Sequence, residues 1–308
     1  MDSIPIIDLK DYVKGSDLLV QNVSRACEEL GMFQVINHGV PQDICQKVMA
    51  TLLEFFQLPY EERAQFFTED QSEQVKIFSY SLKLDDQKKV AMWSETFSHP
   101  WHPTQGFTHL LPKYPPQYRD VFAEYAREIG ALMSMLFGLM SQGLGLEKDC
   151  IEKRVGDRPN LYSLANYYPP CPQPELTLGL NEHNDITALT VLLQLDGVTG
   201  LQVYKDGNWV TVEPVPGALV IILPDQMQVL TNGRYKSAVH RAVTNKWLPR
   251  VSLALFYAPN DETVIGPIEN LISEDHPPNY RSYRYKEFME EFHRQVGQRR
   301  RVKETFEI

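Results

Sequence analysis

The second half of the chain constrains the fold most, because short β segments follow one another there with turn signals between them. Apolar residues alternate with polar ones or run together, and both patterns are typical of strands. The predicted strands are residues 161–168, 187–194, 201–204, 209–212, 218–223, 236–243 and 250–257. Asp206-Gly207 predicts a tight hairpin between two of them. Closely spaced short strands of this kind favour a sandwich, a jelly roll or a barrel.

The first half has the apolar periodicity of amphipathic helices. We predict helices over residues 16–30, from Pro41 onward and, as the longest, over 116–143. Helices must cover one face of the sheet to bury it, so the sequence predicts an α+β fold in a single domain, 1–308. Its parts are described by range: a mainly helical support (1–157), a strand-rich core (158–265) and a C-terminal helical segment (266–308).

Composition excludes several classes of protein. The 308 residues include 30 Lys and Arg against 40 Asp and Glu, a net charge of −10, whereas a nucleic-acid binder normally has a basic face. No window approaches the roughly 18 consecutive apolar residues that suggest a membrane span, and the first residues lack the features of a signal peptide. The four cysteines form no C-x-x-C pair. We therefore expect a cytoplasmic protein with free thiols and neither a membrane nor a nucleic-acid partner. We also expect a monomer, although the composition leaves the oligomeric state open.

Three residues in the β-rich half have the chemistry of a metal site. His183 and Asp185 are two residues apart, so on a strand their side chains point to the same side, and His240 follows later in the chain. Two imidazoles and one carboxylate form the facial triad of non-haem Fe(II) oxygenases. This ligand set leaves coordination positions open for a co-substrate and dioxygen.

An arginine and a serine follow on the next predicted strand. Arg250 and Ser252 are again two residues apart and lie in the otherwise apolar run Arg-Val-Ser-Leu-Ala-Leu-Phe. A guanidinium beside a hydroxyl can anchor a carboxylate, and a buried arginine needs an anionic partner. The dicarboxylate 2-oxoglutarate fits this anchor, because its 2-oxo acid end stays available to chelate iron.

With these residues in place, the chain resembles the plant 2-oxoglutarate- and Fe(II)-dependent dioxygenases, the group related to isopenicillin N synthase. The resemblance extends over nearly the whole chain and rests on sequence blocks in family order. The blocks are Ile4-Pro5-Ile6-Ile7-Asp8-Leu9, Gly31 to Val40, Leu58 to Arg63, Asn166 to Pro172, His183-x-Asp185, Ser237-x-x-His240-Arg241 and Arg250-x-Ser252. The resemblance implies a double-stranded β-helix, the cupin-like jelly roll, with supporting helices packed on one face.

The resemblance also implies a role for each matching residue. His183, Asp185 and His240 ligate Fe(II). The 2-oxoglutarate site consists of Arg250, Ser252, Tyr168 and Asn166. The implied reaction converts 2-oxoglutarate and dioxygen to succinate and carbon dioxide while a small plant molecule of specialised or hormone metabolism is oxidised, most often hydroxylated. Ascorbate is the implied reductant.

The organic substrate is less constrained. Phe256 matches a family position that packs against the substrate, and Ala258 lies close to it. We expect specificity in residues 78–101 as well, where candidate aromatic walls would favour a flat or bulky apolar substrate. These candidates are Phe78, Trp93, Phe97 and Trp101. Within the family, the chain looks closest to alkaloid and specialised-metabolite hydroxylases such as hyoscyamine 6-hydroxylase.

Two departures from the family pattern affect the site. Asn184 stands where the family often has Thr or Ser, and its side chain should point away from the ligands. Ile222 replaces a polar inward residue in a segment where Pro224 alters the turn, which predicts a drier wall.

Two alternatives remain open. An ACC oxidase-like enzyme would share the iron triad but not use 2-oxoglutarate; Asn166-Tyr167-Tyr168-Pro169 argues against it, because those oxidases resemble Ser-Asn-Tyr-Pro there. A non-catalytic small-molecule-binding module on the same fold is the other alternative. The presence of all three ligands and of the Arg–Ser anchor argues against it.

Overall fold

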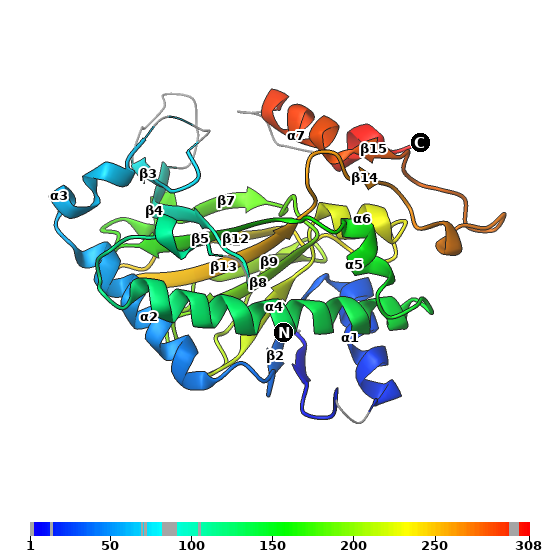
Figure 1. The fold of residues 1–308 in the computed structure, drawn as a ribbon, viewed down its shortest axis with the longest axis horizontal. Coiled ribbons are helices and arrows are strands. Elements are labelled where there is room, and N and C mark those ends of the chain that lie inside the picture. Colours follow the sequence, from blue (N-terminus) through cyan, green and yellow to red (C-terminus); the bar gives the residue numbers. More distant parts are fainter. Residues whose placement is uncertain are drawn as a thin grey trace.

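The computed structural model describes residues 3–12, 15–68, 70, 73–81, 91–103, 106–295 and 302–308. Two facing β-sheets form its centre, and helices cover the outer face of the larger sheet (Figure 1). Among the described residues, no helix is both long enough and apolar enough to span a bilayer.

The larger sheet runs in the order β1-β2-β11-β8-β13-β5-β4-β3, with β6 paired to β4. Its strands are β1 (Ile6–Asp8), β2 (Met32–Ile36), β3 (Lys76–Ser81), β4 (Ala91–Pro100), β5 (Asn160–Tyr168), β6 (Thr177–Leu178), β8 (Leu189–Gln194), β11 (Leu219–Ile222) and β13 (Arg250–Ala258). Strands distant in sequence are therefore neighbours, as a jelly roll requires. β13 lies between β8 and β5 and pairs antiparallel with both.

The smaller sheet has the order β10-β9-β12-β7. Its strands are β7 (Leu180–His183), β9 (Leu201–Lys205), β10 (Asn208–Thr211) and β12 (His240–Ala242). Asp206 and Gly207, both with positive φ, form the expected hairpin between β9 and β10. A third, two-stranded sheet near the C-terminus pairs β14 (Val264–Ile265) with β15 (Tyr283–Arg284).

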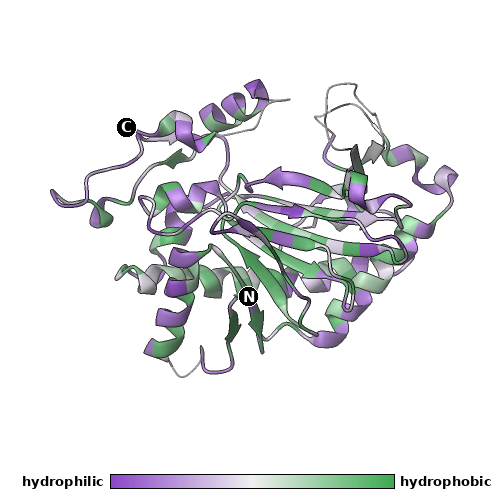
Figure 2. Ribbon diagram, turned by 180° about the vertical axis from the view of Figure 1, so that it is seen from behind, coloured by the Kyte–Doolittle hydropathy of each residue, from purple (hydrophilic) through white to green (hydrophobic). Residues whose placement is uncertain are grey.

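Helices fill the first half of the chain and recur near the end. They are α1 (Asp17–Glu29), α2 (Gln42–Gln57), α3 (Tyr60–Arg63), α4 (Tyr118–Gly143), α5 (Cys150–Val155), α6 (Asp225–Leu230) and α7 (Tyr285–Arg294). The Ser16 side chain caps α1 by accepting from the Leu19 N–H. α4 runs alongside the larger sheet next to α1 and α2 (Figure 1). Figure 2 shows how apolar the central strands are compared with α7.

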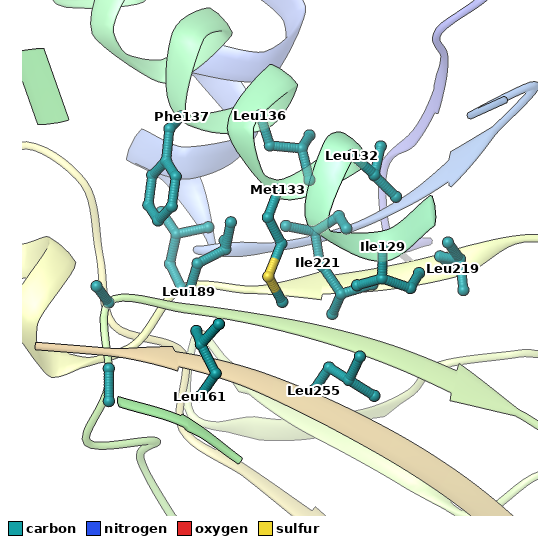
Figure 3. Close-up of a cluster of buried hydrophobic side chains, with 14 of the residues drawn as sticks. Ile129, Leu132, Met133, Leu136, Phe137, Leu161, Leu189, Leu219, Ile221 and Leu255 are labelled. Atoms are coloured by element: carbon teal, nitrogen blue, oxygen red, sulfur yellow. The ribbon is translucent and has the colours of Figure 1, made fainter. Parts of the chain in front are cut away.

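Alternate residues of the larger sheet belong to two different hydrophobic clusters. Leu253 and Leu255 of β13 pack against the helix layer, whereas Ala254 and Phe256 point between the two sheets. Figure 3 shows the helix side, where Met133 of α4 lies over Leu189 and Ile221. One face of the sheet is thus buried by helices, and the other face is left for the interior of the jelly roll.

The expected fold is confirmed: a jelly-roll core with supporting helices on one face. The elements that the sequence did not predict include β7 and α6, which flank Asp185. β7 is a short strand of exposed and half-buried residues that is defined by its pairing with β12. α6 starts directly after Pro224, and nearly all its residues are buried, so it has no polar face to reveal it.

Candidate metal centre and co-substrate site

The predicted ligands come together on the smaller sheet. His183 ends β7 and lies directly opposite His240 of β12, with the ring centroids 4.2 Å apart. Asp185 lies just beyond β7, and its Oδ1 is 3.6 Å from His183 Nε2 and 3.7 Å from His240 Nε2. One ligand atom from each residue lies within 4.8 Å of the others, a spacing that a single metal ion can bridge. His183 is the most exposed of the three, so the centre is accessible from its side.

Hydrogen bonds on the far side of each ligand fix which atom faces the centre. His183 Nδ1 donates to the carbonyl of Asn181 at 2.8 Å, and His240 Nδ1 donates to that of Ala238 at 3.0 Å. Both imidazoles therefore present an unprotonated Nε2. Asp185 Oδ2 accepts from the Thr190 hydroxyl at 2.7 Å, which leaves Oδ1 for the metal.

The protonation states also suit a cation. Burial, with a contribution from His183, lowers the pKa of His240 to about 4. Burial acts to raise the pKa of Asp185, but His240, His183 and Thr190 outweigh it, so the pKa lies below its ordinary value. At neutral pH the His240 imidazole is thus neutral and the Asp185 carboxylate is ionised, the forms that bind metal. This donor set and its orientation fit Fe(II).

A buried arginine lies on the facing sheet. Arg250 of β13 is 2% exposed, and its guanidinium carbon is 5.1 Å from the centre of the Tyr168 ring. Its Nη2 donates to Gln194 Oε1 at 3.1 Å, while Arg250 Nε and Gln194 Nε2 are buried without hydrogen-bond partners. Among the described residues, no Asp or Glu forms an ion pair with this guanidinium. An unpaired buried guanidinium beside an unsatisfied amide fits the carboxylate of 2-oxoglutarate.

The other predicted co-substrate residues share the interior face with Arg250. In the sheet register, Arg250 is opposite Tyr168, and Ser252 is opposite Asn166. Asn166 Oδ1 accepts from the Thr96 hydroxyl at 2.8 Å, which orients its amide. All four of the predicted side chains are buried.

Two glycines make room for this anchor. A Cβ on Gly200 would lie 2.7 Å from Arg250 Cδ, and a Cβ on Gly179 would lie 2.4 Å from the Tyr168 ring. Neither distance is compatible with a side chain at its position. The close approach of the backbone at these two points holds the guanidinium and the phenol ring in place.

Two of the predicted substrate-contacting residues lie on the interior face. Phe256 stacks on Tyr162 with a centroid distance of 4.8 Å and an interplanar angle of 13°. Phe78 of β3 is in register with Thr96, which in turn is in register with Asn166.

The expectation that the remaining four residues line the substrate pocket needs correction. Phe97 is fully buried on the helix side of β4, where it packs against Phe55 and Tyr118. Trp101 and Ala258 belong to the same helix–sheet cluster, and alternation along β4 places Trp93 on the face of Phe97. The sequence alone did not reveal which face of β4 points inward. Residues 82–90 of the predicted specificity region lie outside the described residues.

Sequence reasoning missed several contributors to the site. Thr190, Gln194 and Tyr162 are ordinary strand residues, and the pairing of β8 and β5 with β13 is what brings them to the site. The alternation of strand residues would have found them once that pairing was known.

Asn184 and Ile222, which depart from the family pattern, both make contacts next to the site. Asn184 Nδ2 donates to the Ser237 hydroxyl at 2.8 Å, which links the segment of Asp185 to that of His240. Ile222 is buried in the interior cluster with Met32 and Phe256, so the wall there is apolar as expected.

Two family models match the chain. The model of the 2OG-Fe(II) oxygenase superfamily matches residues 159–259, which include the three predicted metal ligands and Arg250. The model described as non-haem dioxygenase in morphine synthesis N-terminal matches residues 4–118.

Curated relatives and solved structures agree with these matches. Protein DMR6-LIKE OXYGENASE 2 of Arabidopsis thaliana is 41% identical, covering 94% of this chain and 83% of the relative. Flavanone 3-dioxygenase 2 of Oryza sativa subsp. japonica is 38% identical, with the same coverage. The structure of JOX2 in complex with 2OG, Fe and JA has a TM-score of 0.88 at 33% identity, covering 100% of this chain and 90% of that one.

Proposed function

The chain belongs to the 2OG-Fe(II) oxygenase superfamily and is a 2-oxoglutarate-dependent dioxygenase, and from this premise we propose the residues that carry its reaction. It oxidises a small molecule of plant specialised or hormone metabolism, with Fe(II), 2-oxoglutarate as co-substrate and ascorbate as reductant. Hydroxylation is the outcome that we propose for its substrate.

His183, Asp185 and His240 are the proposed metal ligands. Fe(II) held there supplies the redox chemistry through which dioxygen oxidises 2-oxoglutarate and then the organic substrate. The protein keeps each Nε2 unprotonated through the carbonyls of Asn181 and Ala238. Thr190 restrains the Asp185 carboxylate so that one oxygen stays available.

Arg250 carries the proposed co-substrate role. The single observation behind it is a buried guanidinium with an unsatisfied Nε and no carboxylate partner among the described residues. Ser252 and Tyr168 lie beside it on the interior face, and Asn166 lies one register position further along. We assign the distal carboxylate of 2-oxoglutarate to Arg250, Ser252 and Tyr168, and its 2-oxo acid end to the Asn166 side.

The organic substrate is proposed to contact Phe256 and Phe78. Both side chains are on the interior face, and a flavanone 3-dioxygenase of rice is among the chain's relatives. The likeness to hyoscyamine 6-hydroxylase stays a prediction. We also propose a cytoplasmic monomer without a nucleic-acid partner, which the net charge of −10 supports.

Replacing Arg250 tests this assignment. We expect Arg250→Ala to raise the 2-oxoglutarate concentration needed for half-maximal succinate release far more than the corresponding substrate concentration, because the buried carboxylate anchor is lost. Arg127→Ala, on the exposed face of α4, is the control. An equal effect on both concentrations would contradict the anchor role. Turnover without consumption of 2-oxoglutarate would favour the ACC oxidase-like alternative, and absence of 2-oxoglutarate binding would favour the binding module.

A further inference from the structure

Tyr162 occupies a distinctive place on the interior face. It lies on β5 in register with Phe256 of β13, and Phe256 is in register with Thr190 of β8. Thr190 in turn holds the Asp185 carboxylate. One row of side chains therefore leads from the metal centre to Tyr162 across two strand spacings, about 10 Å.

The Tyr162 ring is fixed, but its hydroxyl is not used. The ring stacks on Phe256 at 4.8 Å, and the side chain is partly exposed. Among the described residues, no group forms a hydrogen bond with its hydroxyl. Burial, with contributions from Tyr285 and Asp185, raises the pKa of this phenol well above its ordinary value, so it stays a neutral donor. The phenol is therefore a neutral donor without a partner in the described part of the chain, on a side chain that is partly accessible and can be reached by a ligand.

We propose that Tyr162 is a specificity-determining residue that donates a hydrogen bond to a carbonyl or phenol oxygen of a neutral, flat substrate. This inference rests on the proposed function of the centre. The substrate lies over Phe256, with the carbon to be oxidised toward the Asp185 end of the row and its oxygen toward Tyr162. A molecule of two or three fused or linked rings spans about 10 Å, the distance across two strand spacings.

The surroundings of Tyr162 favour an uncharged ligand. Its neighbours in the register are Phe256 on one side and Pro100 on the other, and Leu164 follows on the same face of β5. None of these side chains can neutralise a carboxylate, and Asp185 is near enough to repel one. A substrate carboxylate here would be desolvated without a cation, whereas a carbonyl needs only one donor.

The test compares Tyr162→Phe with wild type, both loaded with Mn(II) and 2-oxoglutarate so that no turnover occurs. The neutral probe is naringenin, a flavanone with a ketone and phenols, and the acidic probe is jasmonic acid. We expect wild type to bind naringenin more tightly than jasmonic acid. Tyr162→Phe should weaken naringenin binding about 3- to 10-fold, the size of one neutral hydrogen bond. The measurement is the dissociation constant by calorimetry.

Tyr167→Phe is the matched control, because Tyr167 lies on the opposite face of the same strand and stacks on Phe56. It should leave naringenin binding unchanged. An equal loss in both variants, no loss in Tyr162→Phe, or tighter binding of jasmonic acid would overturn the inference, as would failure of wild type to bind naringenin. Retained 2-oxoglutarate binding shows that the variants are folded. Loss of 2-oxoglutarate binding in wild type would instead refute the proposed function.

Discussion

In each proposed metal ligand, a hydrogen bond to one atom of the side chain leaves another atom to face the centre. His183 Nδ1 and His240 Nδ1 donate to backbone carbonyls, and the Thr190 hydroxyl donates to Asp185 Oδ2. The two Nε2 atoms and Asp185 Oδ1 are thus directed toward one another without a cation. Such preorganisation matters because partners behind the ligands contribute substantially to metal affinity.

Thr190→Val tests this orientation. The variant removes the hydrogen bond to Asp185 Oδ2 but keeps the shape of the side chain. We expect the dissociation constant for Mn(II) or Fe(II) to rise about 10-fold, the lower end of such effects. Thr187→Val is the control, since the Thr187 hydroxyl is buried without a hydrogen-bond partner. Unchanged metal affinity in Thr190→Val would contradict the role of this hydroxyl.

His99 makes stability depend on pH. It is fully buried between Tyr118 and Ser163, and burial lowers its pKa to about 4. The unfolded chain binds a proton near pH 6.5 and the folded chain does not, so stability is lost as the pH falls from about 6.5 toward 4. The loss attributable to His99 is about 3 kcal/mol at pH 4. Urea unfolding of the metal-free protein at several pH values measures this effect. The free energy of unfolding of His99→Gln should fall less steeply with falling pH than that of wild type. The same pH dependence in both proteins would contradict the role of His99.

At the scale of elements, α6 and the C-terminal segment brace the loop that carries Asp185. The Asp225 N–H donates to the carbonyl of Asp185 at 2.9 Å, and Gln226 Nε2 donates to that of Ile186 at 3.1 Å. Tyr283 of β15 donates to Gln226 Oε1 at 2.7 Å. A helix and a strand from different parts of the chain therefore hold one ligand loop between them.

The buried pair of Lys303 and Asp225 anchors this brace. Their Nζ and Oδ1 atoms are 3.0 Å apart, and the side chains are 16% and 7% exposed. Lys303→Met leaves a buried carboxylate unpaired, so we expect the free energy of unfolding to fall by about 3 kcal/mol. Arg284→Met breaks an exposed pair with Glu262 in the same segment and should cost about 1 kcal/mol or less. An equal decrease in the free energy of unfolding of the two variants, measured by urea titration, would contradict the anchoring role of Lys303 and Asp225.

Elements and residues with a local sequence pattern could be predicted, whereas those defined by strand pairing across the chain could not. α4 was predictable because its apolar residues recur at helical spacing. The candidate ligands were predictable because two imidazoles and one carboxylate are the characteristic ligand set of non-haem Fe(II) oxygenases. β7 was not, since only its pairing with β12 defines it. Phe97 was assigned to the wrong side because the register of β4 is set by β5, far along the chain.

At the scale of the whole molecule, the larger sheet has its main hydrophobic core on one face and the candidate site residues on the other. Its helix-covered face packs against the large core with Met133 and Leu255 (Figure 3). Its interior face carries Arg250, Ser252 and the row that ends at Tyr162. Across from that face, the smaller sheet and the residue just beyond β7 carry the proposed metal ligands. The single-domain organisation stays a prediction, which a core drawn from both halves of the chain supports.

Anaerobic titration of the Fe(II)-loaded protein with 2-oxoglutarate, followed by visible absorption, tests the central claim most directly. Wild type should develop a weak saturable band, because the 2-oxo acid chelates the metal while Arg250 holds the distal carboxylate. Asp185→Ala should abolish the band, and Arg250→Ala should shift its midpoint to higher 2-oxoglutarate concentration. No band in wild type, or the same midpoint in all three proteins, would contradict a centre built from these residues.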